Sequence, residues 1–235
     1  AVGGLPVRRS RRPGRAGRGG GRGSRGQRGH GVSASRVVLW RHGQTDLNIA
    51  GRIQGSLDVP LNDSGRSQAQ AAAAVLAEYS PSLVVSSPLA RAHSTAQALA
   101  HSLDLDVAVD DRLVERDFGR WEGLDRDAIR SGWPEQFATW TSGGQPEGLG
   151  VETRAAVGER VSAAIDEWAG RAEGTVVVVA HGSALTCGVS ALLGMDPENW
   201  FGLRGMDNCH WAILASQLGR HPAWRINAYN LGAKA

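Results

Sequence analysis

Two short runs of this chain combine residue types suited to phosphoryl transfer. Residues 41–43 read Arg-His-Gly and residues 181–183 read His-Gly-Ser, and each run directly follows an apolar segment. A neutral imidazole such as that of His42 can attack phosphorus, and the planar guanidinium of Arg41 matches phosphate oxygens. The glycine after each histidine lets backbone N–H groups approach an anion closely. These runs predict an anion site with a histidine nucleophile.

Two further charged residues fit the same chemistry. Arg91 comes shortly after the apolar run 83–86, and Glu115 lies within residues 113–119. An arginine here would neutralise charge on the oxygens of a transferring phosphoryl group. A glutamic acid would protonate the leaving alkoxide and then deprotonate the attacking water, although Asp117 and Glu122 are alternatives nearby in the sequence. An Arg-His-Gly run alone is weak evidence in a chain rich in Arg and Gly, and the combination carries the prediction.

The elements that must position these residues can be read from apolar periodicity. Short apolar, β-branched runs predict strands, and longer amphipathic or Ala-rich runs predict helices. The expected strands are residues 36–40, 83–86, 175–180, 211–215 and 224–229, and the expected helices are 62–79, 89–102, 151–169 and 183–193. Residues 110–150 show no clear period and are expected to be less regular.

Alternation of strands and helices predicts the fold class. It favours an α/β fold, a three-layer αβα sandwich with a mostly parallel central sheet. Ligands of such sheets bind outside the carboxyl ends of the strands. Both histidine runs follow the ends of expected strands, so His42 and His181 are expected in one crevice.

Charge is distributed unevenly along the 235 residues. Residues 1–35 contain nine Arg and no acidic residue, and the remaining 17 basic against 23 acidic residues give residues 36–235 a net charge of −6. We expect residues 1–35 to be a disordered Gly/Arg-rich leader and residues 36–235 to form one domain. The leader could be a nucleic-acid tether, a membrane-surface patch or translated sequence upstream of the true start. The acidic domain argues against nucleic acid as a partner.

Composition excludes several other classes of protein. The two cysteines, Cys187 and Cys209, form no paired motif, so neither a disulfide framework nor a metal site is expected. No apolar run approaches the roughly 20 residues of a membrane span, and the leader lacks the apolar core of an export signal. A cytoplasmic protein without metal or cofactor is expected.

The motifs together resemble one family, the histidine phosphatase superfamily, which is also called phosphoglycerate-mutase-like. The resemblance covers residues 36–230 and is carried in this order by 39–45 (LWRHGQT), 60–65 (PLNDSG), 86–92 (SSPLARA), Glu115 with 118–123 (FGRWEG), and 179–182 (VAHG).

The resemblance implies a role for each matching residue. His42 would be the nucleophile, Arg41, Arg91 and His181 the phosphate pocket, and Glu115 the general acid and base. Further phosphate or substrate contacts would come from Asn48, Gln54, Gly55, Gly182 and Ser183, although Asn48 could instead be a loop cap. Related phosphatases are often dimers, so a homodimer is a possible assembly.

Two departures favour a phosphatase over a cofactor-dependent mutase of the same family. Those mutases carry Tyr three residues after the acid, where this chain has Phe118. They also carry paired arginines for a second acidic group, whereas residues 131–153 contain no Arg or Lys. A phosphoglycerate mutase and a non-catalytic, phosphate-binding or nucleic-acid-tethered scaffold stay as alternatives.

Three runs look like those of the glucosyl-3-phosphoglycerate phosphatases within this family. They are residues 52–55 (RIQG), 180–182 (AHG) and 205–211 (GMDNCHW). Such a substrate carries a carboxylate as well as a phosphate, so one more cation is expected, and Arg52 and Arg116 are the candidates. Promiscuous sugar-phosphate or nucleotide phosphatases share most of these motifs, so the substrate class stays open at this point.

Overall fold

A six-stranded sheet forms the centre of the computed structural model, which describes residues 34–233. The strands are β1 (Ala34–Arg41), β2 (Pro81–Ser86), β3 (Val107–Val109), β4 (Gly174–Ala180), β5 (Trp211–Ser216) and β6 (Trp224–Leu231). Their order is β3-β2-β4-β1-β5-β6. Strands β1 to β4 are parallel to one another, β5 is antiparallel to β1, and β6 is antiparallel to β5. The expected mostly parallel sheet is confirmed.

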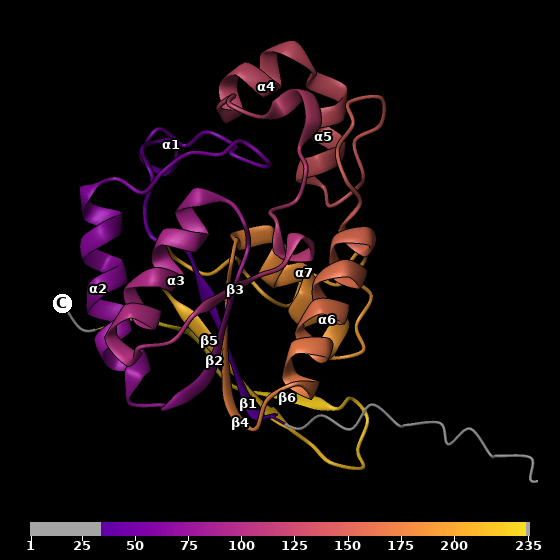
Figure 1. Ribbon diagram of the computed structural model, residues 1–235. Coiled ribbons are helices and arrows are strands. Elements are labelled where there is room, and N and C mark those ends of the chain that lie inside the picture. Colours follow the sequence, from indigo (N-terminus) through magenta and orange to yellow (C-terminus); the bar gives the residue numbers. More distant parts are fainter. Residues whose placement is uncertain (1–33, 234–235) are drawn as a thin grey trace, which may run out of the picture.

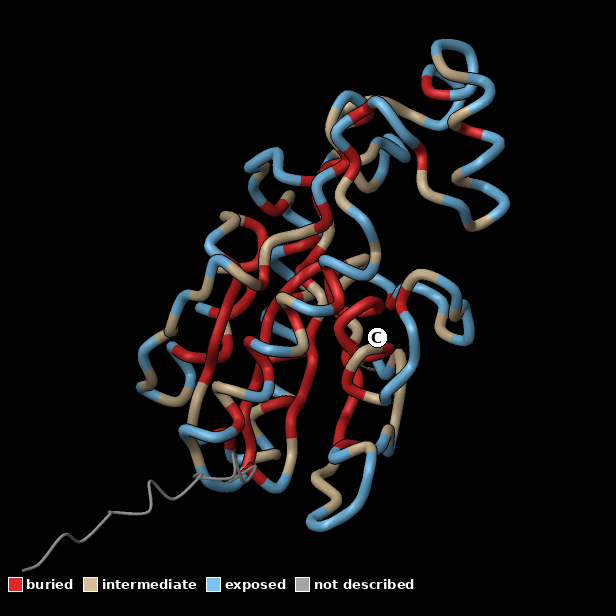
Figure 2. The backbone as a smooth tube through the Cα atoms, turned by 90° about the vertical axis from the view of Figure 1, so that its right-hand side faces the viewer, coloured by how far each residue is buried: buried red, intermediate tan, exposed pale blue. Residues whose placement is uncertain are grey.

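Helices cover both faces of this sheet (Figure 1). On one face lie α2 (Asp63–Ala77) and α3 (Ala90–Leu103), and on the other α6 (Arg154–Gly170) and α7 (Gly182–Leu192). Each pair shares a hydrophobic cluster with one side of the strands. Figure 2 shows that buried residues concentrate in the strands and the inward faces of the helices. The three-layer αβα sandwich predicted from the sequence is confirmed.

Local signals set the element boundaries. The Asn62 side chain accepts the Gly65 N–H at 2.8 Å and begins α2. The Thr153 side chain accepts the Ala156 N–H at 3.1 Å, so α6 begins at Arg154 and not at the expected residue 151. The first strand begins at Ala34, which pairs with Gly174, two residues before the predicted start of the domain. The leader prediction for residues 1–33 lies outside the described residues.

The segment expected to be irregular contains two short helices. They are α4 (Arg126–Gly132) and α5 (Pro134–Thr141), preceded by the 3₁₀ turns η1 (Asp111–Leu113) and η2 (Gly119–Trp121). Helices of seven and eight residues are too short to display a sequence period. They project beyond the carboxyl ends of the strands in Figure 1 and share a third hydrophobic cluster with Trp121. Strand β3 and the four-residue helix α1 (Asp46–Ile49) were not predicted from the sequence.

Membrane spans, cysteine pairing and metal binding were not expected from the composition. No helix within residues 34–233 has the length and apolar character needed to cross a bilayer. Cys187 and Cys209 are both free and buried. Within the same residues no group of histidine, cysteine and acidic side chains is arranged to hold a metal ion.

Candidate active site

The two histidine runs lie side by side because their strands are neighbours. Arg41 ends β1 and pairs with Ala180, which ends β4. Parallel strands end at the same edge of a sheet, so the next residues, His42 and His181, lie together there. Their ring centroids are 5.2 Å apart, and both side chains are buried. The sequence prediction that these histidines share one crevice agrees with this geometry.

The hydrogen bonds of His42 determine its tautomer. Its Nδ1 lies 2.7 Å from the Gly43 carbonyl oxygen. A carbonyl can only accept, so Nδ1 carries the proton and Nε2 keeps its lone pair. The Asn208 side-chain amide donates to the carbonyl oxygens of His42 at 3.2 Å and Gly43 at 3.3 Å. His42 is thereby fixed as a neutral ring with a free nucleophilic nitrogen.

Both imidazoles are held neutral by their surroundings. Burial lowers the pKa of His42 well below its usual 6.5, and the charges of Arg41 and Arg91 lower it further against the opposing Gly43 hydrogen bond. Burial also lowers the pKa of His181, with Arg91, His42 and Arg41 acting in the same direction. A neutral His42 is the form that attacks phosphorus. A neutral His181 acts by hydrogen bonding and not through a charge.

The two arginines are anchored by backbone carbonyls. Arg91 is fully buried and donates from Nη1 to the Leu57 oxygen at 2.6 Å and from Nη2 to the Gly55 oxygen at 2.8 Å. Arg41 donates from Nη1 to the Met206 oxygen. Burial lowers the pKa of both guanidinium groups, and the Glu115 carboxylate opposes that shift in each. Because the backbone carbonyls that hold the two guanidinium groups carry no net charge, the positive charges stay available to an anion.

Three residues of this site have a buried side-chain nitrogen without a hydrogen-bond partner. Six buried side-chain nitrogens in residues 34–233 lack a hydrogen-bond partner, and three of them are Nε of Arg41, Nε of Arg91 and Nδ1 of His181. Leaving a buried donor unpaired costs about 1–3 kcal/mol. Three such donors around a nucleophilic imidazole match the equatorial oxygens of a phosphoryl group.

Glu115 reaches the same place from a different element. Its carboxylate accepts the N–H of Ser183 at 3.2 Å and of Ala184 at 2.8 Å, in the first turn of α7. A helix N-terminus favours a negative group at this position. A Cβ added to Gly182 would lie 3.6 Å from the Arg41 guanidinium carbon and 3.8 Å from Glu115 Oε2. The acid therefore borders the arginine that flanks the nucleophile.

The two alternative acids have other partners. Asp117 is exposed and accepts the Gly119 N–H. Glu122 accepts the backbone N–H of Ser56 at 2.8 Å and the Ser56 hydroxyl at 2.8 Å, which ties two loops together. Glu115 is thus the acid that the geometry favours.

The remaining predicted contacts have mixed placements. The Asn48 side-chain oxygen accepts the Thr45 N–H at 3.0 Å in a capping box. This oxygen therefore caps the loop, which was the alternative to a phosphate contact. Gln54 is buried and accepts the Thr45 hydroxyl at 3.0 Å. Gly55 acts through its carbonyl, which holds Arg91. The Ser183 N–H donates to Glu115 at 3.2 Å, because a helix N-terminus suits a carboxylate. A contact of Ser183 with phosphate stays a prediction.

A family model settles the affiliation of the chain. The model of the histidine phosphatase superfamily (branch 1) matches residues 37–231. This chain belongs to the histidine phosphatase superfamily. The resemblance read from the sequence motifs is therefore confirmed.

Relatives within the superfamily include phosphatases of small molecules. A glucosyl-3-phosphoglycerate phosphatase of Mycobacterium tuberculosis is 41% identical in an alignment 221 residues long that covers 86% of this chain and 96% of that protein. A phosphoserine phosphatase 1 of Hydrogenobacter thermophilus is 32% identical and covers 82% of this chain and 92% of its own length. A structure of mycobacterial glucosyl-3-phosphoglycerate phosphatase with VO3 is 38% identical and superposes with a TM-score of 0.76 over 85% of this chain and 100% of that one.

Several residues of this histidine phosphatase site were missed in the sequence. The Ser87 hydroxyl lies 2.8 Å from His181 Nε2, and the Thr95 hydroxyl accepts the Gly43 N–H at 3.1 Å. Asn208 holds the nucleophile loop. Ser87 and Asn208 lie inside motifs that were recognised, so the motif was a signal although no chemical role could be read from it. Thr95 gives no signal, because it looks like any polar residue of a helix.

Proposed function

We propose that this chain is a metal-independent phosphatase that hydrolyses glucosyl-3-phosphoglycerate through a phosphohistidine at His42. One observation carries the proposal: His42, whose Nε2 is free, lies beside His181 and is acted on by the charges of Arg41 and Arg91, and all three residues have a buried side-chain nitrogen without a partner. Positive charge from two arginines supplies the electrostatic stabilisation that phosphoryl transfer requires. The proposed substrate is taken from the similar glucosyl-3-phosphoglycerate phosphatases described above.

The first step transfers the phosphoryl group to the enzyme. His42 Nε2 forms a bond to phosphorus as the bond from phosphorus to the ester oxygen breaks. Glu115, protonated for this step, gives its proton to the departing alkoxide. The arginine donors and His181 Nδ1 bind the equatorial oxygens.

The second step returns the enzyme to its starting form. A water attacks the phosphohistidine, and Glu115 takes one of its protons as the bond between nitrogen and phosphorus breaks. Inorganic phosphate leaves, and Glu115 is again protonated. Covalent catalysis thus divides one difficult displacement into two easier ones.

Ser87 orients the second histidine for this role. For a neutral His181 to donate to a phosphate oxygen, its ring proton must be on Nδ1, which faces no other partner among the described residues. Its Nε2 then accepts the Ser87 hydroxyl proton at 2.8 Å, while the Ser87 oxygen accepts the Leu89 N–H at 3.3 Å. His181 then donates to a phosphate oxygen in both steps.

The substrate's carboxylate needs a further cation, and Arg116 is better suited than Arg52. Arg52 is exposed. Arg116 is only 3% exposed and is held by neutral acceptors, the Glu152 carbonyl at 2.7 Å and Gln145 Oε1 at 2.9 Å. Its charge has no carboxylate partner among the ion pairs of the described residues. A buried, uncompensated guanidinium favours an anionic ligand.

A substrate panel tests the proposal. Phosphate release is measured with EDTA on glucosyl-3-phosphoglycerate, 3-phosphoglycerate, phosphoserine, sugar phosphates and nucleotides. We expect glucosyl-3-phosphoglycerate to have the highest kcat/KM and His42→Ala to lose activity at least 10³-fold, on the order seen when catalytic nucleophiles are removed. His101→Ala, which removes an exposed histidine of α3, is the matched control. Activity that survives in His42→Ala would disprove the nucleophile, and a better substrate from another class would replace the proposed one.

The proposal extends to location and assembly. A cytoplasmic location and a homodimer are consistent with related phosphatases of small metabolites. Fractionation of cells and sedimentation of the purified chain would test them, and a monomer at micromolar concentration would contradict the dimer.

A further inference from the structure

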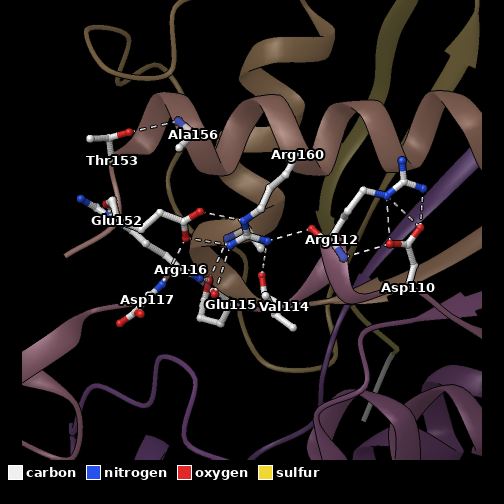
Figure 3. A network of polar contacts seen from close by, with 11 residues as sticks. Asp110, Arg112, Val114, Glu115, Arg116, Asp117, Glu152, Thr153, Ala156 and Arg160 are labelled. Carbon is white, nitrogen blue, oxygen red and sulfur yellow. Dashed lines mark hydrogen bonds and ion pairs between the residues drawn. The ribbon is translucent and has the colours of Figure 1, made fainter. Parts of the chain in front are cut away.

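The backbone around Glu115 is held by a single side chain from another element. The guanidinium of Arg160, on α6, donates to the carbonyl oxygens of Arg112 at 2.8 Å, Val114 at 2.7 Å and Glu115 at 3.1 Å (Figure 3). The Arg112 carbonyl lies within the short turn η1, and those of Val114 and Glu115 lie in the irregular stretch that follows it, where no strand or helix ladder orders the chain. Arg160 therefore takes the place of secondary structure in this stretch.

A carboxylate holds Arg160 in turn. Glu152 accepts from Arg160 Nε at 2.8 Å and from Nη2 at 2.9 Å, which is the two-point geometry that fixes a guanidinium in a plane. The Glu152 backbone also bonds with the Asp117 carbonyl at 2.9 Å, and its carboxylate accepts the Asp117 N–H at 3.3 Å. The backbone is thus fixed on both sides of Glu115 (Figure 3).

Helices α6 and α7 hold different parts of Glu115. The first turn of α7 binds the Glu115 carboxylate, and Arg160 of α6 binds the backbone that carries it. These helices pack against each other in one hydrophobic cluster. The Glu115 carboxylate and the Glu115 backbone are therefore both held by the packed pair of helices α6 and α7.

We propose that Arg160 is a positioning residue that fixes Glu115 for proton transfer. This inference rests on the acid role proposed for Glu115 above. Arg160 does not touch substrate; it acts by holding the main chain from which the acid extends. A misplacement of about 1 Å in a catalytic group can cost about 10²-fold in rate.

An assay that separates proton donation from general damage tests this role. An alkyl phosphate needs its leaving oxygen protonated, whereas p-nitrophenyl phosphate releases a stable phenolate without a proton. kcat/KM covers the steps up to the first phosphoryl transfer, so the ratio of the two values reports on the acid. Loss of folded enzyme would lower both values equally and leave the ratio unchanged.

We expect Arg160→Met to lower kcat/KM for glycerol phosphate by about 10²-fold and that for p-nitrophenyl phosphate by less than about 3-fold. Arg160→Lys keeps the charge, but its single ammonium group cannot span three carbonyls and Glu152, so it should restore little. Arg171→Met is the matched control, because Arg171 follows the same helix, its one ion pair among residues 34–233 is with Glu167 on the surface, and its guanidinium otherwise lies over the Trp168 ring. The control should leave both values unchanged.

Glu115→Gln separates failure of this inference from failure of the proposed function. If Glu115→Gln lowers kcat/KM equally for both substrates, Glu115 is not the acid, and the proposed function fails at that point. If Glu115→Gln acts selectively on glycerol phosphate but Arg160→Met and Arg160→Lys do not, the positioning role is overturned. If Glu115→Gln and Arg160→Met both lower kcat/KM selectively for glycerol phosphate, the double variant should have a kcat/KM less than about 3-fold below that of Glu115→Gln alone. The effects should not multiply, because the two residues act through one group.

Discussion

The imidazole rings of His42 and His181 lie with their centroids 5.2 Å apart, and both are buried beside two guanidinium groups. Burial alone disfavours a charged imidazole, and each arginine adds repulsion. These surroundings disfavour protonation of both histidines, and the positive charge of the arginines stays available to an anionic substrate. Neutral His42 is thus the resting state of the nucleophile.

Direct titration of the rings should confirm this state. Because burial, Arg41 and Arg91 lower the pKa of His42, its carbon-bound ring proton should not shift as the pH falls from 8 through 6.5. The His181 ring should behave in the same way. NMR titration, with assignment by the His42→Gln and His181→Gln variants, measures this. A titration midpoint at or above 6.5 for either ring would contradict the account.

The same shifts make folding stability depend on pH. An unfolded histidine takes up a proton near pH 6.5, but His42 and His181 in the folded chain do so only at lower pH. The unfolded state then binds more protons, so stability is fully present above pH 6.5 and falls as the pH drops toward the folded pKa values. Each histidine contributes a slope of up to about 1.4 kcal/mol per pH unit in that window.

Urea unfolding at several pH values between 5 and 7.5 measures this slope. His42→Gln should be less pH-dependent than the wild-type chain, because it removes one of the two linked protons. An equal slope in both proteins would show that other groups control the acid sensitivity.

A third prediction concerns Ser87. Its hydroxyl lies 2.8 Å from His181 Nε2, so Ser87→Ala leaves that nitrogen buried without a partner and no longer fixes the ring proton on Nδ1. We expect kcat/KM to fall about tenfold, the equivalent of about 1.4 kcal/mol for one such hydrogen bond.

Ser190→Ala is the matched control for Ser87→Ala. Ser190 is also buried, but its hydroxyl bonds to the Thr186 carbonyl within α7. Its loss should leave kcat/KM unchanged. If both variants are equally impaired, loss of a buried hydroxyl, and not the orientation of His181, accounts for the result.

The parts of the site that the sequence predicted share one physical basis. His42, Arg91 and His181 follow apolar runs, and parallel strands bring their carboxyl ends to one edge, so local patterns sufficed to place them together. The fold class followed from the same alternation of strands and helices.

The parts that escaped prediction depend on contacts distant in sequence. Arg160 sits in an amphipathic helix and looks like a solvated charge, and only the fold brings it to Val114, 46 residues earlier. Asn208 reaches His42 across 166 residues. The Ser183 N–H contacts Glu115, which lies 68 residues earlier, and this contact too could not be read from the sequence.

A final prediction concerns the close approach that shapes the nucleophile loop. A Cβ added to Gly43 would lie 2.5 Å from the Gly65 carbonyl oxygen, which belongs to the backbone of α2 and cannot move aside as a side chain could. Gly43 also donates its N–H to Thr95 and its carbonyl fixes the His42 tautomer. Gly43→Ala should therefore displace the loop, destabilise the fold by about 1–3 kcal/mol as overpacking does, and lower kcat.

Gly170→Ala provides the comparison, because its added Cβ would meet no atom within 4 Å at the end of α6. Replacing a helical glycine with alanine should stabilise the fold by up to about 1 kcal/mol and leave kcat unchanged. Urea unfolding and phosphatase turnover on both variants decide the matter. If Gly43→Ala were as stable and active as the wild-type chain, the loop could shift without moving His42, and the contact with Gly65 would not be what fixes the nucleophile.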